Sequence, residues 1–425
     1  MRVQTTAGPL RVSHDAGLIH ARGVPYASAE RFQPPRPLPR SATVRDATAR
    51  GPVCPQDVPR LDHISGPIVD ALEQREDCLV LSVTAPAEAT GLPVMVWLHG
   101  GAYLSGGGEA AKYDPDDLAR EGVVVVNVTY RLGVFGYLAP AGVGADNLGL
   151  LDQIAALSWV RDNIAAFGGD PGEVTVFGQS AGADSVLALI AAPPAKGLFR
   201  RAIAQSAPTG TRTERGAMVR AMRAAFAARL DGDPLTARTD RILTAQGHVI
   251  AVARRFGLVS GMPFGPIYGV DPLPISSRAA LAAAASEVEL LIGYTAHDAA
   301  PFVALDPRGA MLGRFGGVGR GIGRRVTRRV TARVFADPAA ELARLWERSG
   351  GGVATFRFDW HPPAAPFGAC HCVELPLLFS GDWSDAPMLG GHPVPDRLAA
   401  QVRHTWAEFA RKGIGGLSGR ALRFR

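Results

Sequence analysis

Short apolar, β-branched runs recur along the chain, and most of them are continuous rather than alternating with polar residues. A continuous apolar run bounded by turn residues is typical of a strand that is covered on both faces, as in a parallel sheet. The predicted strands are residues 76–83, 93–98, 122–128, 174–177, 288–294 and 353–358.

Between these runs, apolar residues recur at the three- and four-residue spacing of an amphipathic helix. The predicted helices are residues 152–167, 183–192, 212–230 and 401–411, the last with Val402, Trp406 and Phe409 facing inward. Residues 1–50 instead alternate short extended runs with turn residues. The order of elements therefore predicts an α/β protein with a mostly parallel central sheet, helices on both faces and an N-terminal antiparallel edge.

One segment departs from this pattern by being rich in glycine and arginine. Residues 313–323 favour a mobile loop, and Val326, Val330 and Val334 then recur every four residues with arginines around the turn. That spacing favours a surface helix with a solvated basic face over a partner site. The cluster from Arg314 to Arg333 holds seven arginines and no acid.

Charge elsewhere is balanced, since the other 38 of the 45 Lys and Arg face 39 Asp and Glu, so the net charge of +6 is local. No aromatic residues are interleaved with the arginines, and no nucleic-acid partner is expected. No run reaches the length of about 18 apolar residues that a membrane span needs. The N-terminus lacks the apolar core of a signal peptide, so we expect a cytoplasmic protein without a membrane span.

The 425 residues and their 47% hydrophobic content allow a large core. We expect one domain over residues 1–425, because α/β folds often exceed the usual domain length. The four cysteines are too few for a disulfide scaffold. Cys370-His371-Cys372 lacks a second pair of ligands elsewhere, so neither a metal nor another cofactor is expected.

The candidate chemistry centres on Gly178-Gln179-Ser180-Ala181-Gly182, which follows the strand 174–177 and opens the helix 183–192. A strand that turns through G-x-S-x-G into a helix is a nucleophile elbow, which holds its serine on a strained backbone. A serine hydroxyl also needs a base, an orienting acid and donors for the oxyanion. The Gly100-Gly101 turn after strand 93–98 is the expected oxyanion loop, acting with the N–H of Ala181.

Chain order then selects the acid and the base, since the acid follows the serine and the histidine comes last. Asp298 lies just past the strand 288–294, and Asp359, past the strand 353–358, is the rival acid. His371 lies beyond that last strand, whereas His392 and His404 have a less clear loop context.

These motifs together resemble the type-B carboxylesterase family, the cholinesterase-like branch of the α/β-hydrolases. The resemblance is specific because many motifs occur in the family's order over nearly the whole chain. The matching residues are 76–79, 99–102, 147–153, 156–157, 159–160, 163–164, 167–171, 178–182, 368–371, 374–375, 406 and 409–410.

The resemblance implies an α/β-hydrolase fold with Ser180 as nucleophile and His371 as base. It implies oxyanion donors at Gly101, Ala102 and Ala181, supported by Gly100. The family's acid is usually a glutamate, and Asp298 replaces it here in a turn that ends in Ala299 instead of glycine. Aspartate is one methylene shorter, so the loop is expected to lie closer to His371.

The chain also ends sooner after Trp406 than is usual in the family, so we expect an abbreviated C-terminus. Cys54 and Cys78 match the family's first disulfide pair, and whether they are bonded here is left open. Tyr103 and Leu104, which lie beside the oxyanion loop in the sequence, and Phe264 are candidates for lining the pocket.

The leading hypothesis is a serine carboxylesterase that hydrolyses small-molecule carboxylic esters through an acyl-enzyme on Ser180. The alternatives are a biosynthetic acyl transferase, lactonase or cyclase on the same scaffold, or a non-catalytic binding module. Product analysis with a competing acceptor separates the first alternative from hydrolysis, and failure of a fluorophosphonate probe to label Ser180 favours the second. Acyl and alcohol preference and the oligomeric state are not predicted.

Overall fold

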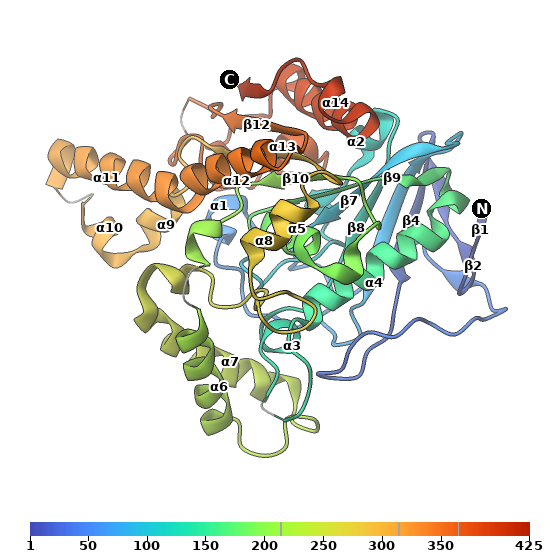
Figure 1. Cartoon of the computed structure of the whole chain (residues 1–425), viewed down its shortest axis with the longest axis horizontal. Helices are drawn as coiled ribbons and strands as arrows, with labels where there is room; N and C mark the ends of the chain where they lie inside the picture. The colour runs from blue at the N-terminus through green and yellow to red at the C-terminus, as the bar shows by residue number, and fades with distance from the viewer. Residues whose placement is uncertain (141, 213–214, 313–314, 364) are drawn as a thin grey trace.

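The structure, a computed structural model, describes residues 1–140, 142–212, 215–312, 315–363 and 365–425. A ten-stranded sheet runs through its centre (Figure 1), in the order β13-β12-β11-β10-β9-β7-β8-β6-β4-β3. Its seven parallel strands are β7 (Leu92–Leu98), β8 (Val124–Val128), β9 (Gly169–Gln179), β10 (Arg201–Gln205), β11 (Glu289–Thr295), β12 (Val353–Phe358) and β13 (Ala421–Phe424).

The N-terminal part forms the antiparallel edge that the sequence predicts. β3 (Ser13–Asp15), β4 (Leu18–Pro25) and β6 (Val80–Pro86) pair antiparallel and join the sheet at β8. β1 (Arg2–Thr5), β2 (Gly8–Arg11) and β5 (Arg45–Asp46) form a separate small sheet. The predicted fold class is therefore confirmed.

Both faces of the sheet are covered, which explains the continuous apolar strands. Along β7, Val94 and Val96 belong to one apolar cluster, and Met95 and Trp97 belong to another on the opposite face. The first cluster includes α4 (Leu148–Asn163), α5 (Ala181–Ala191), α8 (Ser277–Ala284) and α12 (Asp337–Arg348). The second includes α1 (Asp62–Ser65), α2 (Asp116–Arg120), α13 (Leu375–Leu378) and α14 (Asp396–Lys412).

Two further groups of helices extend away from the sheet (Figure 1). α6 (Gly216–Arg229) and α7 (Thr239–Ala253) pack with α3 (Gly133–Tyr137) around a third apolar cluster. α9 (Ala300–Leu305), α10 (Pro307–Leu312) and α11 (Gly316–Thr331) project from another side and return through a π-helical turn, η7 (Ala332–Ala336). None of the helices among the described residues has the length and apolar character needed to cross a bilayer.

The predicted strands and helices are present, with ends that differ by a few residues. β12 matches its predicted range, and α14 buries Val402, Trp406 and Phe409 as expected. β6 begins later than predicted, at Val80. Helix α6 begins at Gly216, and residues 213–214 of its predicted range lie outside the described residues.

The expected mobile loop at residues 313–323 is wrong where the structure describes it. Residues 316–323 belong to α11, because the helix formed by the following residues continues back through the glycines. Residue 313, and Arg314 of the arginine cluster, lie outside the described residues. Val334 is buried, as the four-residue spacing favours, but Val326 is exposed.

Candidate active site

Ser180 occupies the tight turn between β9 and α5, with φ 57° and ψ −121°. Non-glycine residues rarely adopt this conformation, so the turn stores strain of the kind expected of a nucleophile elbow. A Cβ on Gly178 would lie 2.5 Å from the Gly182 carbonyl carbon, and one on Gly182 would lie 1.9 Å from the Leu98 oxygen. Only glycine fits at both positions, which explains the motif.

The loop after β7 lies against this elbow. A Cβ on Gly100 would be 3.3 Å from the Ser180 Cβ, which shows how closely the two backbones approach. Gly101 and Ala102 both have positive φ, at 111° and 56°. Among the hydrogen bonds of the described residues, none uses the N–H of Gly101, Ala102 or Ala181 as a donor. Backbone N–H groups without an internal acceptor are what an oxyanion hole requires, and its location here stays a prediction.

His99 holds the base of this loop without contributing a charge. Its ring stacks on Tyr130 with centroids 4.4 Å apart, and the Tyr130 hydroxyl donates to the His99 carbonyl oxygen at 2.6 Å. Burial lowers the pKa of His99 to about 4. The ring is therefore neutral at pH 7, and it acts as a packing element under the Gly100-Gly101 turn.

Two loops bring the candidate acid and base together at the carboxyl edge of the sheet. Asp298 follows β11, and His371 follows β12 after a longer segment. The His297 N–H donates to the Ala369 oxygen at 2.8 Å, and His297 pairs with Cys370 in a parallel bridge. The next residue in each loop then makes the central contact, between His371 Nδ1 and Asp298 Oδ1 at 2.5 Å.

The second oxygen of Asp298 is also fixed. Its Oδ2 accepts from the Ser206 hydroxyl at 2.8 Å and from the Thr295 N–H at 3.0 Å. Ser206 has a positive φ of 52° and follows β10, a strand that the sequence did not predict. Because β10 was not predicted, nothing in the sequence indicated that Ser206 lies at this edge of the sheet.

The other side of the His371 ring faces the elbow. Its Nε2 lies 3.2 Å from Nε2 of Gln179, the residue directly before Ser180. Among the hydrogen bonds of the described residues, none joins the Ser180 hydroxyl to His371. The ring is enclosed by Phe302 and Phe335, with centroid distances of 5.1 Å and 5.4 Å. Gln179 and both phenylalanines were missed by the sequence reasoning, because their contacts with His371 are set by tertiary structure.

The rival residues lie elsewhere. Asp359 pairs with Arg357 at 2.8 Å, and His404 pairs with Glu121 at 3.2 Å on the surface. No group of three or more His, Cys, Asp or Glu side chains in the described part of the chain is arranged to hold a metal ion. Cys54 and Cys78, like the other two cysteines, are free thiols in the structure.

The three residues expected to line the pocket all belong to the apolar cluster that contains Ala181. Tyr103 is fully buried, and its hydroxyl donates to Asp184 Oδ2 at 2.8 Å. Leu104 and Phe264 are also buried. Through Asp184, Tyr103 connects this apolar cluster to α5, and a role of the three residues in lining a pocket stays a prediction.

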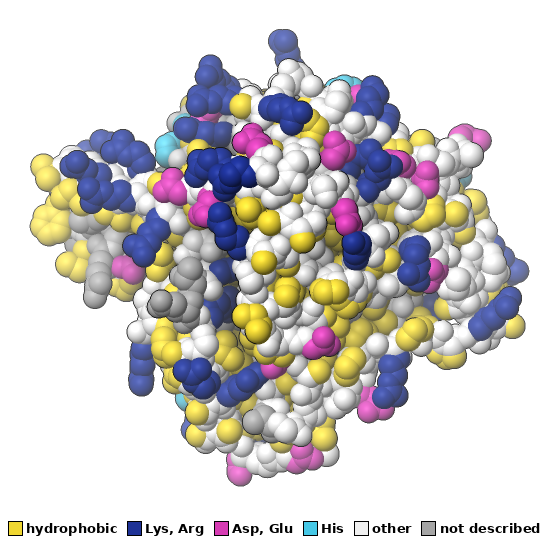
Figure 2. All heavy atoms as spheres, viewed as in Figure 1, with side chains coloured by type: hydrophobic (Ala, Val, Ile, Leu, Met, Phe, Trp, Pro, Cys, Tyr) yellow, Lys and Arg dark blue, Asp and Glu magenta, His cyan; other side chains and the backbone are white. Residues whose placement is uncertain are grey.

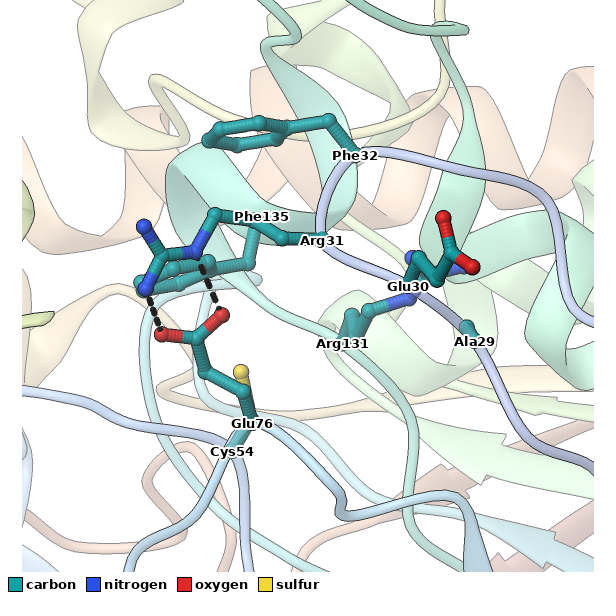
Figure 3. A pocket seen from close by; sticks show the side chains of 8 residues that line it. All are labelled: Ala29, Glu30, Arg31, Phe32, Cys54, Glu76, Arg131 and Phe135. Carbon is teal, nitrogen blue, oxygen red and sulfur yellow. Dashed lines mark hydrogen bonds and ion pairs between the residues drawn. The ribbon is translucent and has the colours of Figure 1, made fainter. Parts of the chain in front are cut away.

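A small cavity is lined by residues other than Ser180, Asp298 and His371, among them Phe32, Cys54 and Arg131 (Figure 3). Its volume of about 20 Å³ has room for one water. Arg31 and Glu76 form a two-point ion pair there, at 2.7 Å and 2.5 Å. We interpret this region as a structural tie between the N-terminal segment and the α6–α7 lobe, since Arg31 also donates to the Ala237 oxygen.

The buried carboxyl of Glu374 lies close enough to Asp298 to interact with its charge. Burial, and then the negative charge of Asp298, raise the pKa of Glu374 to about 8. Its Oε1 accepts from Gln205 at 3.5 Å, whereas its Oε2 has no partner among the described residues. Glu374 is therefore largely neutral at pH 7, although it lies close to Asp298 and His371.

Comparisons with known proteins find relatives over nearly the whole chain. The model of the Carboxylesterase family matches residues 5–313. The chain is 42% identical over 416 residues to a probable N-octanoylanthranilate hydrolase of Rhodococcus erythropolis, covering 95% of this chain and 90% of that protein. It is 35% identical over 446 residues to the para-nitrobenzyl esterase of Bacillus subtilis, covering 97% and 90%. A solved thermophilic para-nitrobenzyl esterase superposes with a TM-score of 0.83 at 33% identity, covering 97% of this chain and 91% of that chain.

Proposed function

The chain belongs to the carboxylesterase family and hydrolyses carboxylic esters, and from that premise we propose that Ser180, His371 and Asp298 are its catalytic triad. The observation that supports this assignment best is the buried contact between Asp298 and His371, whose ring faces the strained elbow that holds Ser180. The substrate is a small-molecule ester.

The proposed reaction begins with proton transfer. His371 Nδ1 donates to Asp298, which leaves Nε2 with its lone pair and selects the tautomer that acts as a base. The Gln179 amide gives up its place beside Nε2, and the Ser180 hydroxyl passes its proton there as its oxygen attacks the ester carbonyl. The carbonyl oxygen becomes negative and accepts hydrogen bonds from the N–H groups of Gly101, Ala102 and Ala181. Each such donor contributes on the order of a hundredfold in rate.

Collapse of this intermediate releases the alcohol, which takes its proton from His371, and leaves the acyl group on Ser180. A water molecule, deprotonated by the same imidazole, then attacks the acyl-enzyme and frees the acid. Burial keeps the Asp298 carboxylate away from solvent throughout, so its interaction with the imidazolium is weakly screened.

The direct test uses a short acyl p-nitrophenyl ester and a fluorophosphonate probe. Wild-type protein is expected to release p-nitrophenol and to be labelled, whereas Ser180→Ala loses both, with kcat lower by on the order of 10⁴-fold or more. Ser158→Ala is a matched control, because Ser158 lies in α4 and, among the described residues, its hydroxyl bonds only to the Ile154 oxygen of its own helix. Turnover that survives Ser180→Ala contradicts the assignment.

We propose amide hydrolysis of an N-acylanthranilate as a second activity of the same site, supported by the relative that is named for it and shares 42% identity. Acylation would proceed as for an ester, with His371 protonating the leaving amine. Release of anthranilate by wild-type protein, and its loss in Ser180→Ala, would support this activity. Ester turnover without anthranilate release would restrict the enzyme to esters.

Hydrolysis is favoured over acyl transfer, lactonase or cyclase activity by the family and by these relatives. A non-catalytic role is disfavoured, because the serine, the carboxylate and the imidazole are all present. Two expectations stay predictions: that residues 1–425 form one domain and that the protein is cytoplasmic.

A further inference from the structure

Helix α11 exposes three of its four large apolar side chains to solvent, and the fourth, Val330, is half-buried. Phe315, just before the helix, is 65% exposed. Val318 is 74%, Ile322 47% and Val326 37% exposed. Spacings of three, four and four residues place all four on one face of the helix. We call them the α11 stripe.

The inner face of the same helix is made of small residues. Gly319, Thr327 and Thr331 are the buried positions of α11. A helix that forms only to cover a core has the reverse arrangement, with apolar residues inside and polar ones outside. The polarity of α11 is therefore not explained by the packing of the monomer.

The exposed apolar surface extends beyond α11. Leu305 in α9 is 45% exposed and Met311 in α10 is 53% exposed. Figure 1 shows α9, α10 and α11 projecting together from the body, and Figure 2 shows hydrophobic side chains gathered at that end of the molecule beside a group of Lys and Arg side chains. A contiguous exposed apolar patch marks an interaction site.

The first half of α11 also has weak intrinsic helix propensity. Five of its first eight residues are glycine, which is among the least favourable residues in a helix interior. Without contacts on its outer face, this part of the helix gains little from packing. Burial of the α11 stripe against an external surface would supply the missing stabilisation.

Charge identifies the kind of surface. The helix contains Arg320, Arg324, Arg325, Arg328 and Arg329 and no acidic residue. A second copy packed stripe to stripe would bring two such clusters together and would be opposed by their repulsion. A basic helix with an exposed apolar face matches a surface that has an apolar interior and negative head groups.

We propose that the α11 stripe docks on an anionic lipid surface, with its apolar side chains at the boundary between head groups and acyl chains and its arginines on the phosphates. This interaction is peripheral and involves no membrane-spanning segment. It goes beyond the esterase activity and does not depend on the assignment of the triad.

The docked segment is continuous with the active site. The hydroxyl oxygen of Thr331, the last residue of α11, accepts from the Ala299 N–H at 3.0 Å, directly after Asp298. One turn farther on, Phe335 contacts the His371 ring. Docking would therefore bring the catalytic edge of the sheet toward esters that partition into the lipid.

The test is co-sedimentation of the full-length protein with vesicles of phosphatidylcholine alone or mixed with phosphatidylglycerol. We expect binding only to the mixed vesicles, and we expect added salt to weaken it. Ile322→Asp and Val318→Asp are each expected to abolish binding. Replacing Arg324 and Arg328 together by glutamine is expected to weaken it by on the order of thirtyfold.

Matched controls separate docking from folding and from catalysis. Ile275 is 89% exposed outside this segment, so Ile275→Asp is expected to bind vesicles as wild type does. Ser180→Ala is also expected to bind normally, and Ile322→Asp is expected to retain turnover of a water-soluble short ester.

Three results would overturn the proposal. The first is no binding to mixed vesicles, and the second is equal binding to both kinds of vesicle. The third is a dimer in sedimentation equilibrium that Ile322→Asp dissociates while vesicle binding is absent, which would assign the stripe to a second copy of the chain.

Discussion

The carboxylate of Asp298 and the imidazole of His371 meet at 2.5 Å across 73 residues of sequence, and both side chains are fully buried. A contact between a carboxylate and a ring N–H at this distance is a strong, charge-assisted hydrogen bond. Because Ser206 and Thr295 hold the other carboxylate oxygen, the acid has little freedom to turn away. The shorter aspartate side chain is thus accommodated by the loops that converge on it.

Replacing Asp298 tests this relationship most directly. In Asp298→Asn, the amide can donate to Nδ1 and so favours the wrong imidazole tautomer. We expect kcat/KM for a short ester to fall by on the order of 10⁴-fold with the fold intact. Ser206→Ala is the matched control, since it removes only a bond to Oδ2, and we expect a loss on the order of tenfold. Asp298→Asn activity within tenfold of wild type would exclude Asp298 as the acid.

Gln179 provides a second prediction through its position 3.2 Å from His371 Nε2. Gln179→Glu places a carboxylate there, and a nearby opposite charge favours the protonated imidazolium. In the pH profile of kcat/KM, the fall in activity on the acidic side is therefore expected to move to higher pH by on the order of one unit. Gln179→Ala removes the amide without adding charge and should leave this fall in place. Equal displacement in both variants would mean that charge is not the cause.

The elbow and the order of the site residues were predictable because their signals are local. Close approaches of neighbouring backbone require glycine at positions 178 and 182, and the resulting spacing of the two glycines can be recognised in the sequence. Asp298 and His371 follow strands of strong apolar character, and the carboxyl ends of parallel strands meet at one edge of the sheet. Asp298 comes three residues after β11, which limits where its side chain lies, whereas His371 follows β12 after a longer segment that is held by the bridge between His297 and Cys370.

Other features depend on tertiary contacts that no local pattern reports. Ser206 follows β10, which has five residues and begins with arginine and ends with glutamine. A strand this short, with polar ends, shows no recognisable apolar pattern in the sequence. The glycines of residues 316–323 favour a loop by propensity, yet they form the first half of helix α11. The enclosure of His371 by Phe302 and Phe335 depends on how α9 and η7 fold back.

A third prediction concerns stability and the buried ion pair between Arg131 and Asp152. The guanidinium makes two side-chain contacts with the carboxylate, at 2.6 Å and 2.8 Å, and both residues are buried. Asp152→Asn leaves the arginine charge uncompensated, so we expect the free energy of unfolding to fall by about 3–5 kcal/mol. Chemical denaturation followed by fluorescence measures this loss.

The double variant Arg131→Met with Asp152→Leu serves as the control for that pair, because it removes both charges together. Its loss of stability is expected to be clearly smaller than the sum of the two single losses. Strictly additive losses would show that the two charges do not compensate each other in the folded protein.

Glu374 yields the last prediction, a pH dependence of stability. Burial and the Asp298 charge raise the pKa of this carboxyl from 4.5 to about 8 in the folded protein. Between these values the folded state holds a proton that the unfolded state has released. The free energy of unfolding therefore falls as pH rises through this window, by on the order of 1.4 kcal/mol per unit from this group.

Glu374→Gln keeps the shape of the neutral side chain and removes its titration. The variant is expected to be close to wild type in stability near pH 5 and to become progressively more stable than wild type up to about pH 8, after which the difference levels off. Denaturant unfolding at a series of pH values measures this difference. Glu347→Gln, at an exposed position of α12, is expected to follow wild type throughout. A Glu374→Gln difference that stays constant with pH would show that Glu374 holds no proton in the folded protein over this range.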